Sequence, residues 1–439
     1  MSKPVVALVG RPNVGKSTLF NKLVGKRLSI VEDTPGVTRD RIYADVEWRN
    51  VVVSVIDTGG LDPKTDDFIF SHMRRQTETA IETADVIVLV TDFSAGLMLD
   101  DVEVALMLKK TNKPVVLCVN KMDNIGKIPD GFYEFYNLGI GDPIAVSSVH
   151  GHGTGDLLDR IFELLPEKVE DEADDSTIKV AVIGKPNVGK SSLVNYILGE
   201  DRMIVSDIPG TTRDAIDTMC ENESGKYMFI DTAGLRKKSK IDNAIEAYSA
   251  LRSHMAVERA QVCLIMIDAK DGVTEQDTKI AGLAHESGKG CIIVVNKWDS
   301  VEKDDYTMNT MKKKIMIELA YMSYAPVIFI SAKTGMRVGK LFELINSVDK
   351  QNSMRVSTGM LNETLNEAVM KVQPPTDKGK RLKILYMTQV SVRPPTFVAF
   401  VNSQKLFHYS YQRYLENQLR EVFGFEGTPI RMIVRERQD

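Results

Sequence analysis

A glycine-rich sequence of eight residues occurs twice in the chain and constrains its fold more than any other feature. The copies, residues 10–17 (GRPNVGKS) and 184–191 (GKPNVGKS), differ at one position. Each follows a short apolar stretch that predicts a strand and precedes a segment that predicts a helix. Glycines let the backbone N–H groups of such a loop surround phosphate oxygens at the positive end of the following helix. The chain is therefore expected to contain two phosphate-binding loops.

The lysine and the serine that end each loop have the chemistry to bind a nucleotide and its metal ion. The two lysines are expected to reach the β- and γ-phosphates, and the two serines to bind a Mg²⁺ ion that bridges them. The loop residues predicted to contact nucleotide are Gly10, Arg11, Pro12, Asn13, Val14, Gly15, Lys16 and Ser17, and Gly184, Lys185, Pro186, Asn187, Val188, Gly189, Lys190 and Ser191.

Two later segments of each copy supply candidate metal ligands that would respond to the γ-phosphate. Thr38 and Thr212 lie in Pro-Gly segments and are predicted to contact both Mg²⁺ and the γ-phosphate. Asp57 and Asp231 end apolar strands and are predicted to hold Mg²⁺ directly or through water. The nucleotide-contacting residues predicted here are Asp57, Thr58, Gly59, Gly60 and Leu61, and Asp231, Thr232, Ala233, Gly234 and Leu235.

A third pair of motifs predicts which base is bound. An aspartate at the end of each motif can accept two hydrogen bonds from the N1–H and the exocyclic amine of guanine, whereas adenine offers no such pair of donors. The sequence therefore predicts GTP and GDP rather than ATP. The motifs are Asn120, Lys121, Met122 and Asp123, and Asn296, Lys297, Trp298 and Asp299; the segments expected to close over the base are Ser147 and Ser148, and Ser331, Ala332 and Lys333.

The spacing of these motifs indicates a duplicated domain. Gly10 and Gly184 are 174 residues apart, and the two base motifs are 176 residues apart. We expect an α/β protein with two P-loop domains, each a mostly parallel sheet wrapped by helices. The predicted boundaries are 1–166 for the first domain, 167–177 for an acidic linker or solvated helix end, 178–352 for the second domain and 353–439 for a small α+β domain.

The C-terminal segment differs from the rest in pattern and in charge. Its expected order is α-β-β-α-β, with helices at 359–370 and 409–423 and strands at 382–392, 396–402 and 430–434. Residues 353–439 contain 13 Lys and Arg and 8 Asp and Glu, a net charge of +5, whereas the whole chain carries −4. A basic module on an acidic chain is typical of a domain that faces RNA.

Composition also favours a soluble protein. No apolar run reaches the ~18 residues of a membrane-spanning helix, and the first residues do not have a signal-peptide pattern. We expect a cytoplasmic monomer without membrane contacts. The four cysteines form no CxxC pair and are expected to be reduced core thiols.

Together these motifs resemble the bacterial tandem-GTPase family called Der or EngA along the full length of the chain. The resemblance implies a GTP-hydrolysing factor in assembly of the large (50S) ribosomal subunit, with nucleotide-dependent binding to ribosomal RNA and protein, and a KH-like third domain. KH modules clamp nucleic acid with a GxxG loop between two helices. Here the only such sequence, Gly424 to Gly427, lies between a helix and a strand and is better read as a helix stop. Direct RNA contact by this domain and a packing role between the GTPase domains both stay open.

The catalytic residues expected are Lys16, Lys190, Asn13, Asn187, Thr38 and Thr212. Many GTPases orient the attacking water with a glutamine, but Leu61 and Leu235 occupy that position and cannot accept a hydrogen bond. The loop asparagines are similar to those of related GTPases that recruit K⁺ in place of an arginine finger; alternatively, asparagine merely suits the turn.

Residues 236–240 (RKKSK) follow the second of these leucines, whereas acidic residues follow the first, so the two domains need not have the same task. A basic switch segment could meet RNA phosphate in one nucleotide state. The alternative is a solvated run of charge.

Two other functions remain as alternatives. A metabolic phosphotransferase also uses a phosphate loop, but the base motifs require guanine and no acceptor pocket is apparent. A regulatory GTPase of tRNA modification, of another RNA-linked process or of membrane traffic is the other, and the absence of an amphipathic anchor weakens its membrane version.

Overall fold

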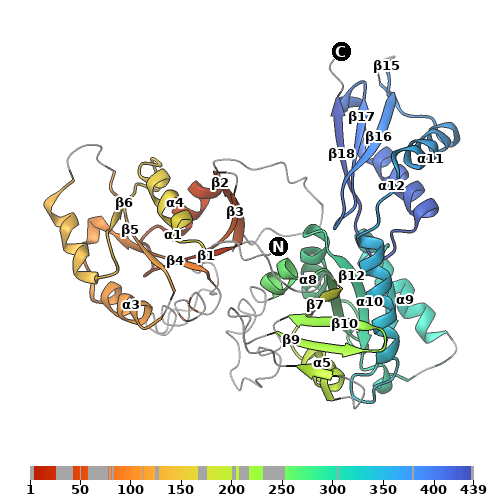
Figure 1. The fold of residues 1–439 in the computed structure, drawn as a ribbon, viewed down its shortest axis with the longest axis horizontal. Helices are drawn as coiled ribbons and strands as arrows, with labels where there is room; N and C mark the ends of the chain where they lie inside the picture. The colour runs from red at the N-terminus through yellow and green to blue at the C-terminus, as the bar shows by residue number, and fades with distance from the viewer. Residues whose placement is uncertain are drawn as a thin grey trace. The chain divides into compact units, whose positions relative to one another are not determined.

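The computed structural model describes residues 4–25, 43–49, 51–57, 78, 81, 84–111, 113–123, 128–166, 176–199, 204–206, 217–230, 253–302, 304, 306–377 and 380–436. The chain forms two compact units, and each is described by itself (Figure 1). One contains the first sheet. The other contains the second sheet and the C-terminal domain. Residues 167–175 of the predicted linker lie outside the described residues, and the predicted domain boundaries stay predictions.

The first unit is a six-stranded sheet in the order β2-β3-β1-β4-β5-β6, parallel except for β2 and β3. Helices α1 and α4 bury their apolar sides on one face of the sheet, and helix α3 and the 3₁₀ helix η3 bury theirs on the other. The bounds are β1 Val5–Val9, α1 Lys16–Val24, β2 Tyr43–Trp48, β3 Val51–Asp57, β4 Val86–Asp92, η2 Phe93–Ala95, α3 Leu99–Lys109, β5 Val115–Asn120, η3 Asp130–Leu138, β6 Ile144–Ala145 and α4 Thr154–Glu163.

The second unit repeats this plan with a seven-stranded sheet in the order β13-β12-β11-β7-β10-β9-β8. Strands β8, β9 and β10 are antiparallel to one another and the remaining neighbours are parallel. The bounds are β7 Thr177–Ile183, α5 Lys190–Gly199, β8 Ile204–Ser206, β9 Thr218–Asn222, β10 Gly225–Ile230, β11 Val262–Asp268, α8 Glu275–Glu286, β12 Gly290–Asn296, η4 Trp298–Ser300, α9 Thr307–Glu318, η5 Ala320–Met322, β13 Val327–Phe329 and α10 Val338–Asn352.

Continuous apolar runs form the central strands because helices cover both faces of the sheet. In β11, Leu264 and Met266 belong to the core under α5 and α10, whereas Cys263, Ile265 and Ile267 belong to the core under α8 and α9. This alternation with a period of two is expected of a parallel strand buried on both sides. Since parallel strands end at the same edge, the residues that follow β1, β4 and β5 meet there, as do those after β7, β11 and β12.

The C-terminal domain has the predicted order of helices and strands. Its three-stranded sheet β16-β17-β18 carries α11 and α12 on one face, and helix α12 buries Tyr411, Leu415 and Leu419 at a spacing of four residues (Figure 1). A short hairpin, β14–β15, precedes the sheet and was not predicted. The bounds are α11 Thr358–Lys371, β14 Thr376–Asp377, β15 Lys380–Arg381, β16 Ile384–Ser391, β17 Thr396–Val401, η6 Gln404–Leu406, α12 Tyr409–Phe423 and β18 Arg431–Glu436.

The turn from Gly424 to Gly427 ends a helix, as the sequence predicts, and also docks the C-terminal domain onto the second GTPase domain. Gly424 caps the C-terminus of α12. The Gly427 carbonyl accepts a hydrogen bond of 2.6 Å from the Cys291 N–H at the start of β12, and the Gly427 N–H donates one of 2.8 Å to the Tyr324 carbonyl. A Cβ at Gly427 would lie 2.3 Å from the Val348 side chain. The GxxG sequence is therefore occupied by packing within the chain.

The cysteines are buried thiols. Cys118, Cys220, Cys263 and Cys291 are all free and buried. Burial raises the pKa of Cys220 to about 12, which suppresses thiolate chemistry.

Among the helices of the described ranges, none combines the length and the apolar character needed to cross a membrane.

Candidate nucleotide-binding sites

The two phosphate loops have nearly the same geometry around their lysines. The Lys16 ammonium donates hydrogen bonds to the carbonyls of Gly10 (2.6 Å) and Arg11 (2.9 Å). The Lys190 ammonium donates to the carbonyls of Gly184 (2.6 Å) and Lys185 (2.7 Å). Each loop thus wraps around an ammonium group at the N-terminus of a helix, an arrangement suited to binding a polyanion.

One glycine in each loop is required by the neighbouring base motif. Gly15 and Gly189 have φ angles of +92° and +99°, and a Cβ on either residue would lie 2.5 Å or 2.2 Å from the side-chain amide of Asn120 or Asn296. Only glycine combines this backbone conformation with such a close approach.

Burial changes the acid–base properties of the loop lysines. Removal from water lowers the pKa of Lys16 to about 8, an effect that the charge of Asp57 opposes and that of Arg11 reinforces. Burial likewise lowers the pKa of Lys190 to about 8. An ammonium kept out of water gains when an anion arrives beside it. The lysines therefore favour binding of phosphate.

The candidate metal ligands of the first site converge. The Ser17 hydroxyl donates a hydrogen bond of 2.5 Å to a carboxylate oxygen of Asp57, which ends strand β3. A hydroxyl and a carboxylate next to a phosphate loop are the oxygen donors that Mg²⁺ prefers. The donor set fits the predicted ion.

Several predicted site residues lie outside the described part of the chain, including the counterpart of Asp57 in the second site. They are Thr38, Thr58, Gly59, Gly60, Leu61, Thr212, Asp231, Thr232, Ala233, Gly234 and Leu235. For the second site, the only described candidate ligand of Mg²⁺ is therefore Ser191.

The base motifs are tied to the phosphate loops by their asparagines. The Asn120 amide donates to the Val14 carbonyl and the Asn296 amide to the Val188 carbonyl, both at 2.8 Å. The amide oxygen of Asn120 accepts from the Ser148 N–H at 3.0 Å and from its hydroxyl at 2.7 Å. The amide oxygen of Asn296 accepts from the Ala332 N–H at 2.9 Å. Each asparagine joins the loop to the closing segment and fixes the walls of the site.

Other residues of the base motifs divide into polar and core positions. Asp123 accepts a hydrogen bond of 2.6 Å from the Ser147 hydroxyl, which orients the carboxylate. Trp298 is buried and its ring lies 4.6 Å from that of Phe329, so its side chain belongs to the core. Lys333 is exposed.

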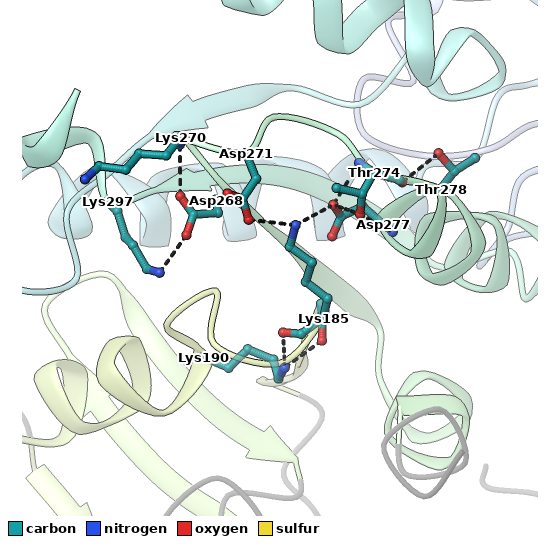
Figure 2. A network of polar contacts seen from close by, with 10 residues as sticks. Lys185, Lys190, Asp268, Lys270, Asp271, Thr274, Asp277, Thr278 and Lys297 are labelled. Carbon is teal, nitrogen blue, oxygen red and sulfur yellow. Dashed lines mark hydrogen bonds and ion pairs between the residues drawn. The ribbon is translucent and has the colours of Figure 1, made fainter. Parts of the chain in front are cut away.

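Four acidic residues that the sequence analysis did not single out contact the predicted site residues. Asp92 and Asp268, at the ends of β4 and β11, each lie 2.6 Å from the ammonium of the base-motif lysine, Lys121 or Lys297. Asp101 lies 3.5 Å from the Arg11 guanidinium. Figure 2 shows the corresponding Lys185 between Asp271, at 3.0 Å, and Asp277, at 3.6 Å. Both acids of each copy are offset by 176 residues, the offset of the base motifs, and this repeat is a signal that could have identified them.

Known proteins resemble the chain over its whole length. Residues 5–121 and 179–297 match a family model described as a 50S ribosome-binding GTPase, and residues 355–435 match the C-terminal KH-domain-like model of EngA bacterial GTPase enzymes. The chain is 64% identical over 438 residues to the GTPase Der of Acetivibrio thermocellus, covering 100% of both chains. It is 57% identical over 439 residues to that of Clostridium tetani, covering 100% of both.

Two parallel sheets, each with a phosphate loop tied to a guanine motif, and a KH-like domain define a P-loop GTPase with tandem domains. The protein is a GTP hydrolase. Its full-length similarity assigns it further: the chain belongs to the GTPase Der family.

Proposed function

We propose that the protein is a GTP-driven switch in ribosome biogenesis that acts in assembly of the 50S subunit. The observation that carries the proposal is the match of both GTPase domains to a family described as 50S ribosome-binding. A cytoplasmic monomer that binds ribosomal RNA and protein in one nucleotide state would meet this task.

Each domain, in this proposal, has its own site for GTP and GDP. Lys16 and Lys190 neutralise the charge that develops on the phosphates. Ser17, Asp57 and Thr38 in the first site, and Ser191, Asp231 and Thr212 in the second, hold Mg²⁺, which bridges the phosphates and offsets their charge. Asp123 and Asp299 select guanine.

The basic C-terminal domain is the proposed RNA contact. Its net charge of +5 supports attraction to phosphate. The turn from Gly424 to Gly427 is engaged with Cys291 and Tyr324, so this turn serves packing and other basic surfaces of the domain would meet RNA. Both roles left open by the sequence are thereby assigned to different parts of one domain.

Co-sedimentation with purified ribosomal subunits tests the proposal. We expect retention on the 50S subunit with a non-hydrolysable GTP analogue and loss of retention with GDP. A variant with Asp123→Asn and Asp299→Asn, which should not load the analogue, is the matched control. Absence of binding in both states contradicts the proposal, and retention of tRNA instead of subunits would support a regulatory GTPase of tRNA modification.

A further inference from the structure

The base-motif lysines occupy a backbone conformation that lysine does not favour. Lys121 and Lys297 have φ angles of +65° and +61°, in the left-handed region. Residues other than glycine, asparagine and aspartate pay a conformational cost there. Since both copies of the motif keep lysine at this position, its side chain must contribute something that glycine or asparagine would not.

The ammonium of each lysine is held by a carboxylate that is itself fixed. One oxygen of Asp268 accepts a hydrogen bond of 2.9 Å from the Lys270 N–H, and the other lies 2.6 Å from Lys297 (Figure 2). In the first domain, Asp92 accepts from the Ser94 N–H at 2.9 Å and from Lys121 at 2.6 Å. The turn after β4 or β11 therefore fixes the acid, and the acid fixes the lysine.

The carboxylate of Asp268 is charged at neutral pH. Burial by itself would raise its pKa, but the hydrogen bonds from Lys297 and from the Lys270 N–H, with the positive charges of Lys297 and Lys185, hold the pKa below its usual value. Charge-assisted hydrogen bonds of this kind are roughly twice as strong as neutral ones.

The second acid of each copy ties the same segment to the phosphate loop. Asp277 forms a capping box with Thr274 at the start of α8, accepting from its N–H at 3.0 Å and its hydroxyl at 2.6 Å, and it lies 3.6 Å from the Lys185 ammonium. In the first domain, Asp101 is fully buried at the start of α3 and lies beside Arg11. Each segment between its two acids thus contacts the base motif at one end and the phosphate loop at the other.

We propose that Asp92 and Asp268 are positioning residues that set the nucleotide affinity of their sites by fixing Lys121 and Lys297 beside the base. This rests on the proposed guanine sites. The lysine side chains are 38% and 40% exposed, so one flank of each stem stays accessible to a planar base. The acids do not read the base edge, a role left to Asp123 and Asp299. Loss of either acid should lower affinity without changing discrimination between bases.

The test needs the two sites to be measured separately in the full chain. An asparagine in place of Asp123 presents an N–H donor that pairs with the additional carbonyl of xanthine and mismatches the guanine amine. In the Asp123→Asn background, guanine nucleotides should therefore titrate the second site alone. The readouts are equilibrium binding of a fluorescent GDP analogue, and KM and kcat for GTP.

On that background we expect Asp268→Asn to weaken GDP binding about tenfold and to raise KM for GTP by the same factor, with kcat unchanged. The charge-retaining Asp268→Glu variant should recover affinity to within about threefold of the parent. Glu275→Gln, at an acid on the first turn of α8 whose side chain is 83% exposed, is the matched control and should bind as the parent does. The ratio of guanine to xanthine affinity should stay constant in all these variants.

Unchanged GDP affinity in Asp268→Asn would overturn the inference. So would a parallel fall in kcat and unfolding temperature, because that pattern describes a residue needed only for folding. The reciprocal experiment, Asp92→Asn in an Asp299→Asn background, should weaken the first site alone. If Asp123→Asn leaves guanine binding intact at both sites, the guanine-site proposal itself fails, and the inference with it.

Discussion

At the scale of single residues, the phosphate-loop lysines combine a buried position with a positive charge. The pKa values of Lys16 and Lys190 fall from 10.5 to about 8 because burial disfavours the ammonium form. The folded state consequently binds fewer protons than the unfolded chain between about pH 8 and pH 10.5. Stability without nucleotide is therefore expected to rise with pH across this window.

Nucleotide binding should take up protons near pH 8. A bound phosphate restores the ammonium form, so each site should gain up to about half a proton at pH 8 and about a tenth at pH 7. Calorimetric titration with GDP in buffers of different ionisation enthalpy measures the uptake. Binding that neither takes up nor releases protons at pH 8 would contradict the assignment of these lysines to phosphate.

The loop asparagines lead to a prediction about ions. Asn13 and Asn187 have φ angles of +66° and +63°, a conformation that asparagine tolerates well, so the turn alone already explains their presence. If they also recruit K⁺, GTP hydrolysis will be faster in KCl than in NaCl at equal ionic strength. Equal rates in the two salts would leave these residues with the turn role only.

At the scale of elements, the turn from Gly424 to Gly427 does work that its sequence does not announce. A helix stop is visible in the sequence, but the hydrogen bonds from Gly427 to Cys291 and Tyr324 join segments more than a hundred residues apart and leave no local pattern. The GxxG spelling is thus explained by close packing against α10.

Replacement of Gly427 should loosen this docking. Gly427→Ala introduces a Cβ 2.3 Å from Val348 at a φ of +73°, a combination expected to cost about 1–3 kcal/mol. Thermal unfolding and limited proteolysis would report a lower unfolding temperature and earlier release of the C-terminal domain. Gly359→Ala, where nothing lies within 4 Å of the new Cβ, is the matched control and should be neutral or slightly stabilising. Equal behaviour of the two variants would show that the turn is not needed for docking.

At the scale of the whole molecule, charge is unevenly distributed. A net charge of +5 on residues 353–439 within a chain of −4 predicts that retention on ribosomal subunits weakens as salt concentration rises. Co-sedimentation with the GTP analogue over a series of KCl concentrations measures this dependence. Retention that does not change with salt would favour a contact made through protein and not through RNA phosphate.

The sequence was sufficient to predict most of the architecture. Continuous apolar runs and the duplicated loops predicted both parallel sheets, and helical periodicity predicted α11 and α12. The hairpin β14–β15 was missed because its two-residue strands are too short for any periodic signal. Asp92 and Asp268 were missed because a single acid after a strand is common, and its importance appears only when the fold brings a lysine to it.

The close agreement between the two sites has a consequence for comparing them. The paired distances from lysine to carboxylate are both 2.6 Å, and those from asparagine to loop carbonyl are both 2.8 Å. Each domain is in effect a replicate of the other, made by the same chain under the same conditions. If the sites prove unequal, the cause has few places to lie within the phosphate loops, which differ only in the planar guanidinium of Arg11 against the compact ammonium of Lys185.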